Sequence, residues 1–331
     1  MPGESVNLTV GNIEEFRNGD ILRLTALNAD NDTVNVWSYP LLYADEYHAQ
    51  THPTVSSSIS ASVTDSTLSA NNVTARFNLS DGMLSRVTAN GKEIPFNNGP
   101  LPIGMKMELT SITRHMQGDT AVMVMRYKGA VDSIVWRMTP DGVLGMDILM
   151  LNRKNGGGFK GAFFDNEIRN LGFSFSYPEE LCKGMTWVGK GPYRVWRNRQ
   201  RGTTFGLWHK DYNNTVTGQT TGKLQYPEFK GYHANTYWAQ LHSDEAPLTV
   251  SSESDGIYLR VFTPEEPKAR TQPGPTMTKF PEGDISFMLE IPPIRSYKPL
   301  EQLGPGGIAP NIRINKGDEG IRMKLWFDFT R

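Results

Sequence analysis

The chain is divided by turns into short segments in which apolar and polar residues alternate, and this pattern limits what it can fold into. The segments TARFNLS, AVMVMRYKG, DSIVWRMTP and IRMKLWFDFT all alternate with a period of two residues. Such alternation is typical of β-strands with one buried and one solvated face. Turn signals at Asp81-Gly82, Asn90-Gly91 and Asp141-Gly142 punctuate the sequence, and no segment shows a helical stripe. The sequence therefore predicts an all-β fold of many antiparallel strands, arranged as a sandwich or a larger layered sheet.

Size and charge exclude several classes of partner. The 331 residues suffice for one large β domain or two ordinary ones. Lys and Arg number 34 against 35 Asp and Glu, a net charge of -1, so we expect no nucleic-acid partner. The longest apolar runs, such as VLGMDILMLN, are far shorter than the ~20 residues that span a bilayer, so we expect no membrane segment. The opening MPGESVNLTV shows no signal peptide. Localisation stays open, with a secreted or periplasmic protein favoured only if the full gene carries a signal peptide.

The sequence predicts neither a metal site nor a cofactor. The single cysteine, Cys182, excludes a disulfide framework and is expected to be an inert core thiol. His48 and His52 are four residues apart with acidic residues nearby, a spacing that would suit a metal ion on a helix. Pro53 and the absence of helical periodicity predict a loop there instead. The glycine-rich NGGGFKG is interpreted as a loop between strands, because no helix or P-loop lysine follows it.

The chain is expected to have two parts. The segment ILRLTALNADNDTVNVWSYPLLYAD predicts a strand, an Asn/Asp turn and a second strand that ends at Pro40. A polar stretch rich in Ser and Thr then runs from Thr51 to Asn72. We therefore expect residues 1–55 to form a short sandwich piece or linker strands and residues 56–331 to form the large β domain.

The stretch WVGKGPYRVWRNRQRGTTFGLWHKDYNN combines tryptophans, tyrosines, arginines and glycines. The rings of Tyr193 and Trp196 would offer flat faces to the C–H side of a pyranose, while Arg194 and Arg197 would donate to hydroxyls or to a carboxylate. The alternative is an exposed strand whose outward residues are simply charged. The Gly-Lys-Gly-Pro loop favours a close approach of a ligand or of another backbone.

A second segment, YPEFKGYHANTYW, places Glu228 and His233 five residues apart around a glycine. A carboxylate and an imidazole can act as general base and general acid, since both can be tuned toward neutral pH. Sugar binding without chemistry and plain structural hydrogen bonding are also compatible with this spacing.

The order of these segments resembles a known family. FNLSDGMLSRVTANGKEIPFNNGPLPI is followed by GKGPYRVWRNR and then by YPEFKGYH. This order is similar to the C-terminal small-chain domain of family 2 β-galactosidases, in which GxGPxExYxDR precedes PxENGxR. The resemblance covers about Val73 to the end and implies an antiparallel β-supersandwich of the galactose mutarotase-like type. The first fifty residues resemble the final strands of the immunoglobulin-like sandwich that precedes this domain in the full enzymes.

The departures from the family pattern limit what can be transferred. Arg194 stands where the family has a glutamate, and Phe229 stands where it has an asparagine. The late segment EEPKARTQPGPTMTKFPEGDISF lacks the tryptophan that reaches the catalytic barrel in well-known members. The family's catalytic acid and nucleophile lie in a (β/α)8 barrel that this chain does not contain.

The first hypothesis is therefore a carbohydrate-binding, non-catalytic C-terminal part of a family 2-like glycoside hydrolase, which helps shape a sugar site supplied by a barrel in the parent chain or in another subunit. The alternative is a free-standing sugar-active enzyme, a polysaccharide lyase or a mutarotase-like protein, with Glu228 and His233 as base and acid and with Arg194 and Arg197 holding a carboxylate. A third possibility is a domain that only supports assembly. The residues expected to line one sugar-sized hollow are Trp187, Tyr193, Arg194, Trp196, Arg197, Tyr226, Glu228, His233 and Trp238.

Overall fold

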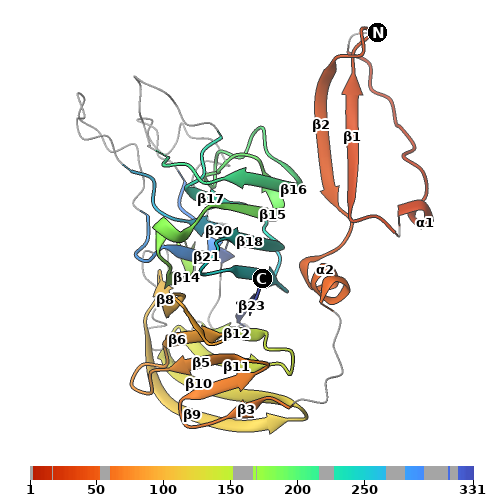
Figure 1. Ribbon diagram of the computed structural model, residues 1–331. Coiled ribbons are helices and arrows are strands. Elements are labelled where there is room, and N and C mark those ends of the chain that lie inside the picture. Colours follow the sequence, from red (N-terminus) through yellow and green to blue (C-terminus); the bar gives the residue numbers. More distant parts are fainter. Residues whose placement is uncertain are drawn as a thin grey trace.

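The computed structural model is an antiparallel β structure of two large sheets, with an N-terminal hairpin standing beside them (Figure 1). It describes residues 3–16, 18–52, 60–151, 167–168, 170–215, 227–265, 280–293, 312–313 and 320–331. Every strand pair within these residues is antiparallel, as the alternating pattern predicts. The all-β supersandwich expected from the sequence is confirmed.

Nine strands of the described chain form the first sheet. In spatial order they are β16 (Thr204–Asp211), β15 (Gly184–Gly191), β18 (Trp238–His242), β19 (Leu248–Ser252), β23 (Ile321–Asp328), β12 (Leu144–Met150), β11 (Val131–Met138), β10 (Thr120–Gly129) and β9 (Met107–Gln117).

Ten strands of the described chain form the second sheet. In spatial order they are β17 (Gly231–His233), β20 (Tyr258–Val261), β21 (Ile285–Glu290), β14 (Leu171–Ser176), β8 (Asn97–Ile103), β6 (Leu84–Ala89), β5 (Val73–Phe77), β4 (Thr67–Ala70) and β3 (Ser62–Val63), with β7 (Lys92–Ile94) pairing beside β6. A separate short pair joins β13 (Glu167–Ile168) to β22 (Ile312–Arg313).

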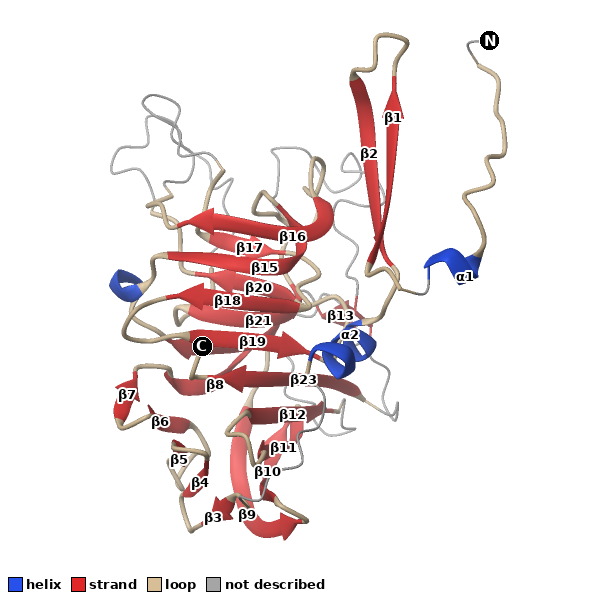
Figure 2. Cartoon of the chain, turned by 45° about the vertical axis from the view of Figure 1, so that its right-hand side comes forward, coloured by secondary structure: helices blue, strands red, loops and turns tan. Residues whose placement is uncertain are grey.

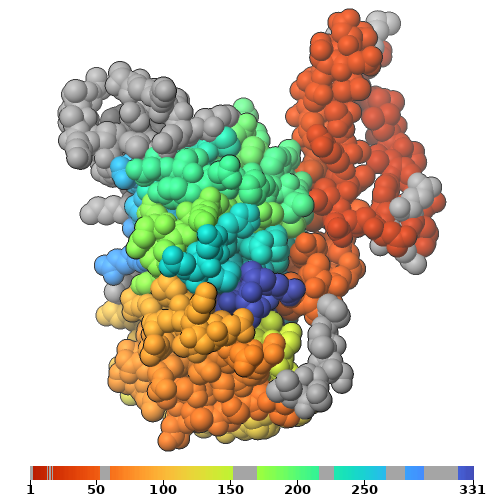
Figure 3. Space-filling view, in the orientation of Figure 1, coloured from red at the N-terminus to blue at the C-terminus, as the bar shows by residue number. Residues whose placement is uncertain are grey.

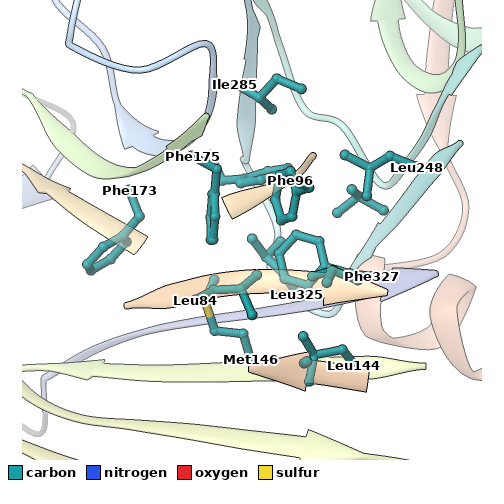
Figure 4. Packing of buried hydrophobic residues seen from close by; sticks show 14 of the residues in the cluster. Leu84, Phe96, Leu144, Met146, Phe173, Phe175, Leu248, Ile285, Leu325 and Phe327 are labelled. Atoms are coloured by element: carbon teal, nitrogen blue, oxygen red, sulfur yellow. The ribbon is translucent and has the colours of Figure 1, made fainter. Parts of the chain in front are cut away.

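The core lies between the two sheets. Figure 4 shows aromatic and aliphatic side chains from both sheets meeting there, with Phe96 and Phe175 stacked 4.5 Å apart between ring centroids. Phe175 belongs to one sheet and Phe327 to the other, and their rings meet edge to face at 5.7 Å. Because alternate residues of each strand point into this layer, the period-two pattern of the sequence is the direct cause of the fold.

The turns follow the sequence signals. Asn90 and Gly91 connect β6 to β7 with φ values of 51° and 77°. Positive φ at both central residues is what a two-residue hairpin needs, and Asn-Gly adopts it at low cost. Gly142, in the turn between β11 and β12, has a φ of 91°.

The N-terminal residues form a hairpin, as predicted, and two helices that the sequence did not indicate. Strands β1 (Ile21–Leu27) and β2 (Thr33–Pro40) pair with each other and stand beside the sandwich in both views (Figures 1 and 2). A single-turn helix, α1 (Ile13–Phe16), precedes them, and a 3₁₀ turn, η1 (Glu179–Leu181), lies within the sandwich sequence.

The predicted loop around His48 is wrong, because α2 (Ala44–Thr51) is a helix. The Glu46 side chain accepts a hydrogen bond from the backbone N–H of Tyr43 at 2.8 Å, which satisfies a free donor at the helix start. Ala44 is fully buried, and its N–H donates to Asp255 at 3.0 Å. The helix ends at Thr51, two residues before Pro53, so the proline limits the helix without preventing it. No helix in the described part of the chain is long and apolar enough to cross a membrane.

Candidate functional site

The two segments singled out in the sequence meet at one end of the sandwich. Strand β15 lies in the nine-stranded sheet and β17 is the edge strand of the ten-stranded sheet. The backbone N–H of Lys190 donates to the carbonyl of Ala234 at 2.8 Å, and Val195 forms an isolated antiparallel bridge with Tyr232. The chain from residue 189 to residue 198 therefore links the two sheets at their open ends and lies against residues 228–233.

The glycines of this link are required by close packing within the protein. A Cβ on Gly191 would lie 2.6 Å from Cγ of Trp208 and 2.7 Å from Cζ2 of Trp187. A Cβ on Gly189 would lie 2.9 Å from the backbone oxygen of Asn235. The close approach expected from the Gly-Lys-Gly-Pro sequence is thus made to indole rings and to the backbone between β17 and β18.

The two tryptophans of the link are covered by protein. Trp187 has no exposed surface, and its ring meets the His233 imidazole edge to face at 5.0 Å. Trp196 is 6% exposed and packs between Tyr232, at 5.6 Å, and Phe280, at 5.1 Å between ring centroids. Neither ring presents an open face to a ligand in this conformation, so both rings contribute to the packing that supports the site.

His233 is fully buried and held in one tautomer. Its Nε2 lies 3.0 Å from the carbonyl oxygen of Phe229, which can only accept, so Nε2 carries the proton and donates. Burial, together with the nearby positive charges of Lys210 and Arg194, lowers the pKa of His233 to about 3. The imidazole is therefore neutral at neutral pH, and its single N–H is bonded to Phe229, so it lacks the second, acidic proton that a general acid would donate.

Glu228 and Arg194 form the accessible rim above these buried rings. Nη2 of Arg194 donates to Oε1 of Glu228 at 3.3 Å, and the two side chains are 12% and 29% exposed. Tyr193, which precedes Arg194 in the sequence, is half-buried. A carboxylate held by a guanidinium at the surface can accept from sugar hydroxyls while the guanidinium donates to others.

Lys210 belongs to the site although the sequence analysis did not name it. It lies on β16, is 6% exposed, and its Nζ donates to the backbone oxygen of Glu228 at 2.5 Å. Burial lowers the pKa of Lys210 to about 8, partly offset by the Glu228 carboxylate. The alternating pattern of this strand could have identified Lys210, since it is two residues from Trp208 and therefore faces the same side of β16.

Arg197 does not lie free in the site. Its Nε lies 2.7 Å from Oε1 of Glu290, at the end of β21, and the two side chains are 9% and 0% exposed. With Arg197 committed to a buried ion pair and Arg194 paired with Glu228, the two arginines do not form an open clamp for a substrate carboxylate.

The remaining predicted residues are placed apart or cannot be placed. Trp238 pairs with Val188 across β18 and β15, on the sheet face opposite Trp187, and packs near Tyr237 and α2. Tyr226 lies outside the described residues, as does most of the late Pro/Gly-rich segment. Within the part of the chain that the structure describes, no group of three or more His, Cys, Asp or Glu side chains is arranged to hold a metal ion.

The comparison with known families agrees with this geometry. Residues 103–273 match the family described as beta galactosidase small chain, which is more than half of the 331 residues and includes both converging segments. No curated protein matches the chain. A fold of two antiparallel sheets closed at one end by these segments, together with this match, shows that the chain belongs to the beta galactosidase small chain family.

Proposed function

We propose that this chain is the accessory, carbohydrate-contacting part of a β-galactosidase-type glycoside hydrolase and that it acts with a larger catalytic part. The observation that carries the proposal is the family match over residues 103–273, because it includes the link between β15 and β17 and the residues packed against it. The catalytic barrel of such an enzyme would belong to the same parent chain or to another subunit.

The proposed contact surface is the rim formed by Tyr193, Arg194 and Glu228. These three side chains retain exposed surface, whereas the rings of Trp187 and Trp196 are covered. The covered rings fix the backbone that carries the rim, and a rigid support of this kind is what a small set of polar contacts needs.

The burial of His233 supports binding without chemistry at this rim. A general acid must carry a proton at the working pH and must reach the substrate. His233 is neutral there and has no exposed surface, while its Nε2–H is already bonded to Phe229. Glu228 would then act as a hydrogen-bond acceptor for sugar hydroxyls.

Calorimetric titration tests the rim. The chain would be titrated with lactose and with digalacturonic acid, comparing wild type with Glu228→Gln, Arg194→Met and Tyr193→Ala. Removing one charged hydrogen-bond partner weakens binding by about tenfold or more, so weak lactose binding should fall by that factor in the first two variants. Arg86→Met is the matched control, because Arg86 pairs with Glu93 on the exposed face of β6.

The outcomes separate the alternatives. Binding of lactose that survives Glu228→Gln contradicts the rim as the contact surface. Binding of digalacturonic acid alone, lost with Arg194→Met, would support a site for acidic sugars instead. If the chain raises galactoside hydrolysis by a family 2 catalytic fragment that lacks its own small-chain region, the proposed partnership is supported; no change in rate contradicts it.

A further inference from the structure

A cleft lies between α2 and the outer face of the nine-stranded sheet. It borders β23, which is the third strand from β15 in that sheet. Its volume is about 570 Å³, within the range of small-molecule sites. One wall is α2, and the opposite wall is the turn Thr139–Asp141 between β11 and β12. Trp326 of β23 and Glu253 complete the lining. Figure 3 shows α2, in orange, lying against the blue C-terminal segment.

Three rings form a continuous stack along this cleft. The His48 imidazole lies 5.5 Å from the Trp326 ring with an interplanar angle of 12°, and His52 lies 4.7 Å from His48 at 13°. Burial lowers the pKa of His48 to about 4, and burial also lowers the pKa of His52. All three rings are therefore uncharged at neutral pH and present apolar faces and edges to the cleft.

The stack is held by specific contacts. The indole N–H of Trp326 donates to Oε1 of Glu253 at 2.6 Å, and Nδ1 of His48 lies 2.9 Å from Oγ of Ser251. Trp326 lies across Gly145 of β12, where a Cβ would come within 2.6 Å of the indole. The glycine allows the indole to lie close to the sheet, and the hydrogen bonds fix its orientation, so the aromatic wall is preorganised.

Polar groups from both walls surround the rings. Asp45 on α2 and Asp141 in the β11–β12 turn are exposed carboxylates, and Thr51, Thr120 and Thr139 also line the cleft. Carboxylates and hydroxyls that flank an aromatic wall match a pyranose, whose C–H face is apolar and whose hydroxyls lie at its edge.

The charges of the lining favour a ligand without net charge. Two carboxylates on opposite walls oppose an anion. Lys324 offsets Glu253 at 3.2 Å, and Arg331 also lines the cleft, so the cleft is not a purely acidic site for a cation. The stacked histidines are neutral and are already bonded to Ser251 and Thr51. We propose that this cleft binds a neutral saccharide, with the C–H face of a sugar ring against the exposed part of the Trp326–His48–His52 stack and with sugar hydroxyls donating to Asp45 and Asp141.

Fluorine NMR of the full chain labelled with 5-fluorotryptophan tests the proposal. The chain has seven tryptophans, and Trp326→Phe identifies the resonance of Trp326. Titration with lactose, cellobiose, xylobiose and mannobiose should shift that resonance for at least one of these neutral sugars. Asp45→Asn and Asp141→Asn change only exposed groups and should weaken this binding by about tenfold each. Glu108→Gln, an exposed carboxylate on β9, should leave it unchanged.

The same resonance decides against the proposal in three ways. If none of the four sugars shifts the Trp326 signal, the cleft is not a saccharide site. A shift with spermidine or with Zn²⁺ but with no sugar would make it a cation site. A sugar-dependent shift that is unchanged in both Asp45→Asn and Asp141→Asn would contradict the proposed contacts of the sugar hydroxyls. Because the Trp326 resonance reports on the cleft alone, this experiment tests the cleft even if the proposal for the Arg194–Glu228 rim fails.

Discussion

Single side chains in this protein show how the same residue types serve binding or packing according to what surrounds them. Cys182 is 5% exposed, and burial raises its pKa to about 11, as expected of a core thiol. Trp187 and Trp326 are both indoles of the nine-stranded sheet, yet the first faces the core and the second faces the α2 cleft. The direction follows from position along the strand, because successive side chains point to opposite faces.

Substituting Gly191 by alanine should destabilise the protein. Its added Cβ would lie within 2.7 Å of the indole rings of Trp187 and Trp208, and overpacking of this kind costs about 1–3 kcal/mol. Gly206→Ala is the matched control on the neighbouring strand, where the nearest atom would be 3.4 Å away and a change within about 0.5 kcal/mol is expected. Urea unfolding followed by tryptophan fluorescence measures both. Equal losses in the two variants would contradict the packing account.

Breaking the ion pair between Arg197 and Glu290 should cost far more than breaking a surface pair. Arg197→Met leaves the fully buried Glu290 carboxylate without this partner, and such changes cost about 3–5 kcal/mol. Arg86→Met removes an exposed pair with Glu93, for which about 0–1 kcal/mol is expected. The double variant Arg197→Met with Glu290→Gln should recover part of the loss, since it removes the buried charge. The free energies of unfolding in urea test this order, and a small loss in Arg197→Met would contradict it.

At the scale of secondary structure, the strands were predictable and the helix α2 was not. Strands β5, β10, β11 and β23 contain the alternating segments seen in the sequence, because a half-buried strand imposes its own local pattern. The eight residues of α2 make only two turns, and the residues that hold it, among them Ala44 and His48, make their contacts with distant parts of the chain. A helix as short as α2 produces no recognisable periodic pattern of apolar residues in the sequence.

Part of the candidate site was also predictable from the sequence. The convergence of residues 189–198 with residues 228–233 followed from the family resemblance. The burial of Trp196 under Phe280 and the pairing of Arg197 with Glu290 could not be inferred, because they depend on how β21 is placed against the link. Contacts between segments distant in sequence have no local signature, and an arginine looks alike in the sequence whether it faces solvent or a buried carboxylate.

The docking of α2 should depend on pH through His48. The unfolded histidine titrates at 6.5 and the folded one at about 4, since burial and His52 lower its pKa more than Glu253 raises it. Between these values the unfolded state binds more protons, so the free energy of unfolding falls as pH is lowered from 6.5 to 4. In His48→Gln, the fall in the free energy of unfolding over this pH range should be smaller by on the order of 1 kcal/mol, after allowance for solvent screening.

The control is His115→Gln, which changes an exposed histidine on β9 and should retain the wild-type pH dependence. Urea unfolding at several pH values between 4 and 6.5 gives the comparison. His233 is also buried neutral and contributes its own dependence in all three proteins, so the difference between variants is the quantity to read. Identical slopes in wild type and His48→Gln would contradict the assignment.

Across the whole molecule, the contacts of α2 place it with the sandwich. We expected residues 1–55 to form one part and residues 56–331 another. The helix, however, buries Ala44 against a cluster that includes Val188, Phe205 and Tyr237 on the outer face of the nine-stranded sheet. The Tyr237 hydroxyl donates to the backbone oxygen of Leu42 at 3.1 Å. We therefore propose that the boundary between the two parts lies before Leu41, between the hairpin and the helix, and not at residue 55.

Two shortened chains test this boundary. A chain of residues 41–331 loses the hairpin but keeps α2, and its free energy of unfolding should stay within about 1 kcal/mol of the full chain, since the hairpin contributes little beyond Ile21 to the cluster. A chain of residues 56–331 loses the hydrogen bonds from Ala44 to Asp255, from Tyr237 to Leu42 and between His48 and Ser251. At about 1 kcal/mol each, with the exposed apolar cluster in addition, it should lose about 3–5 kcal/mol. Equal stability of the two shortened chains would support a boundary at residue 55 instead. Loss of cooperative unfolding in the chain of residues 41–331 would indicate that the hairpin is part of the domain.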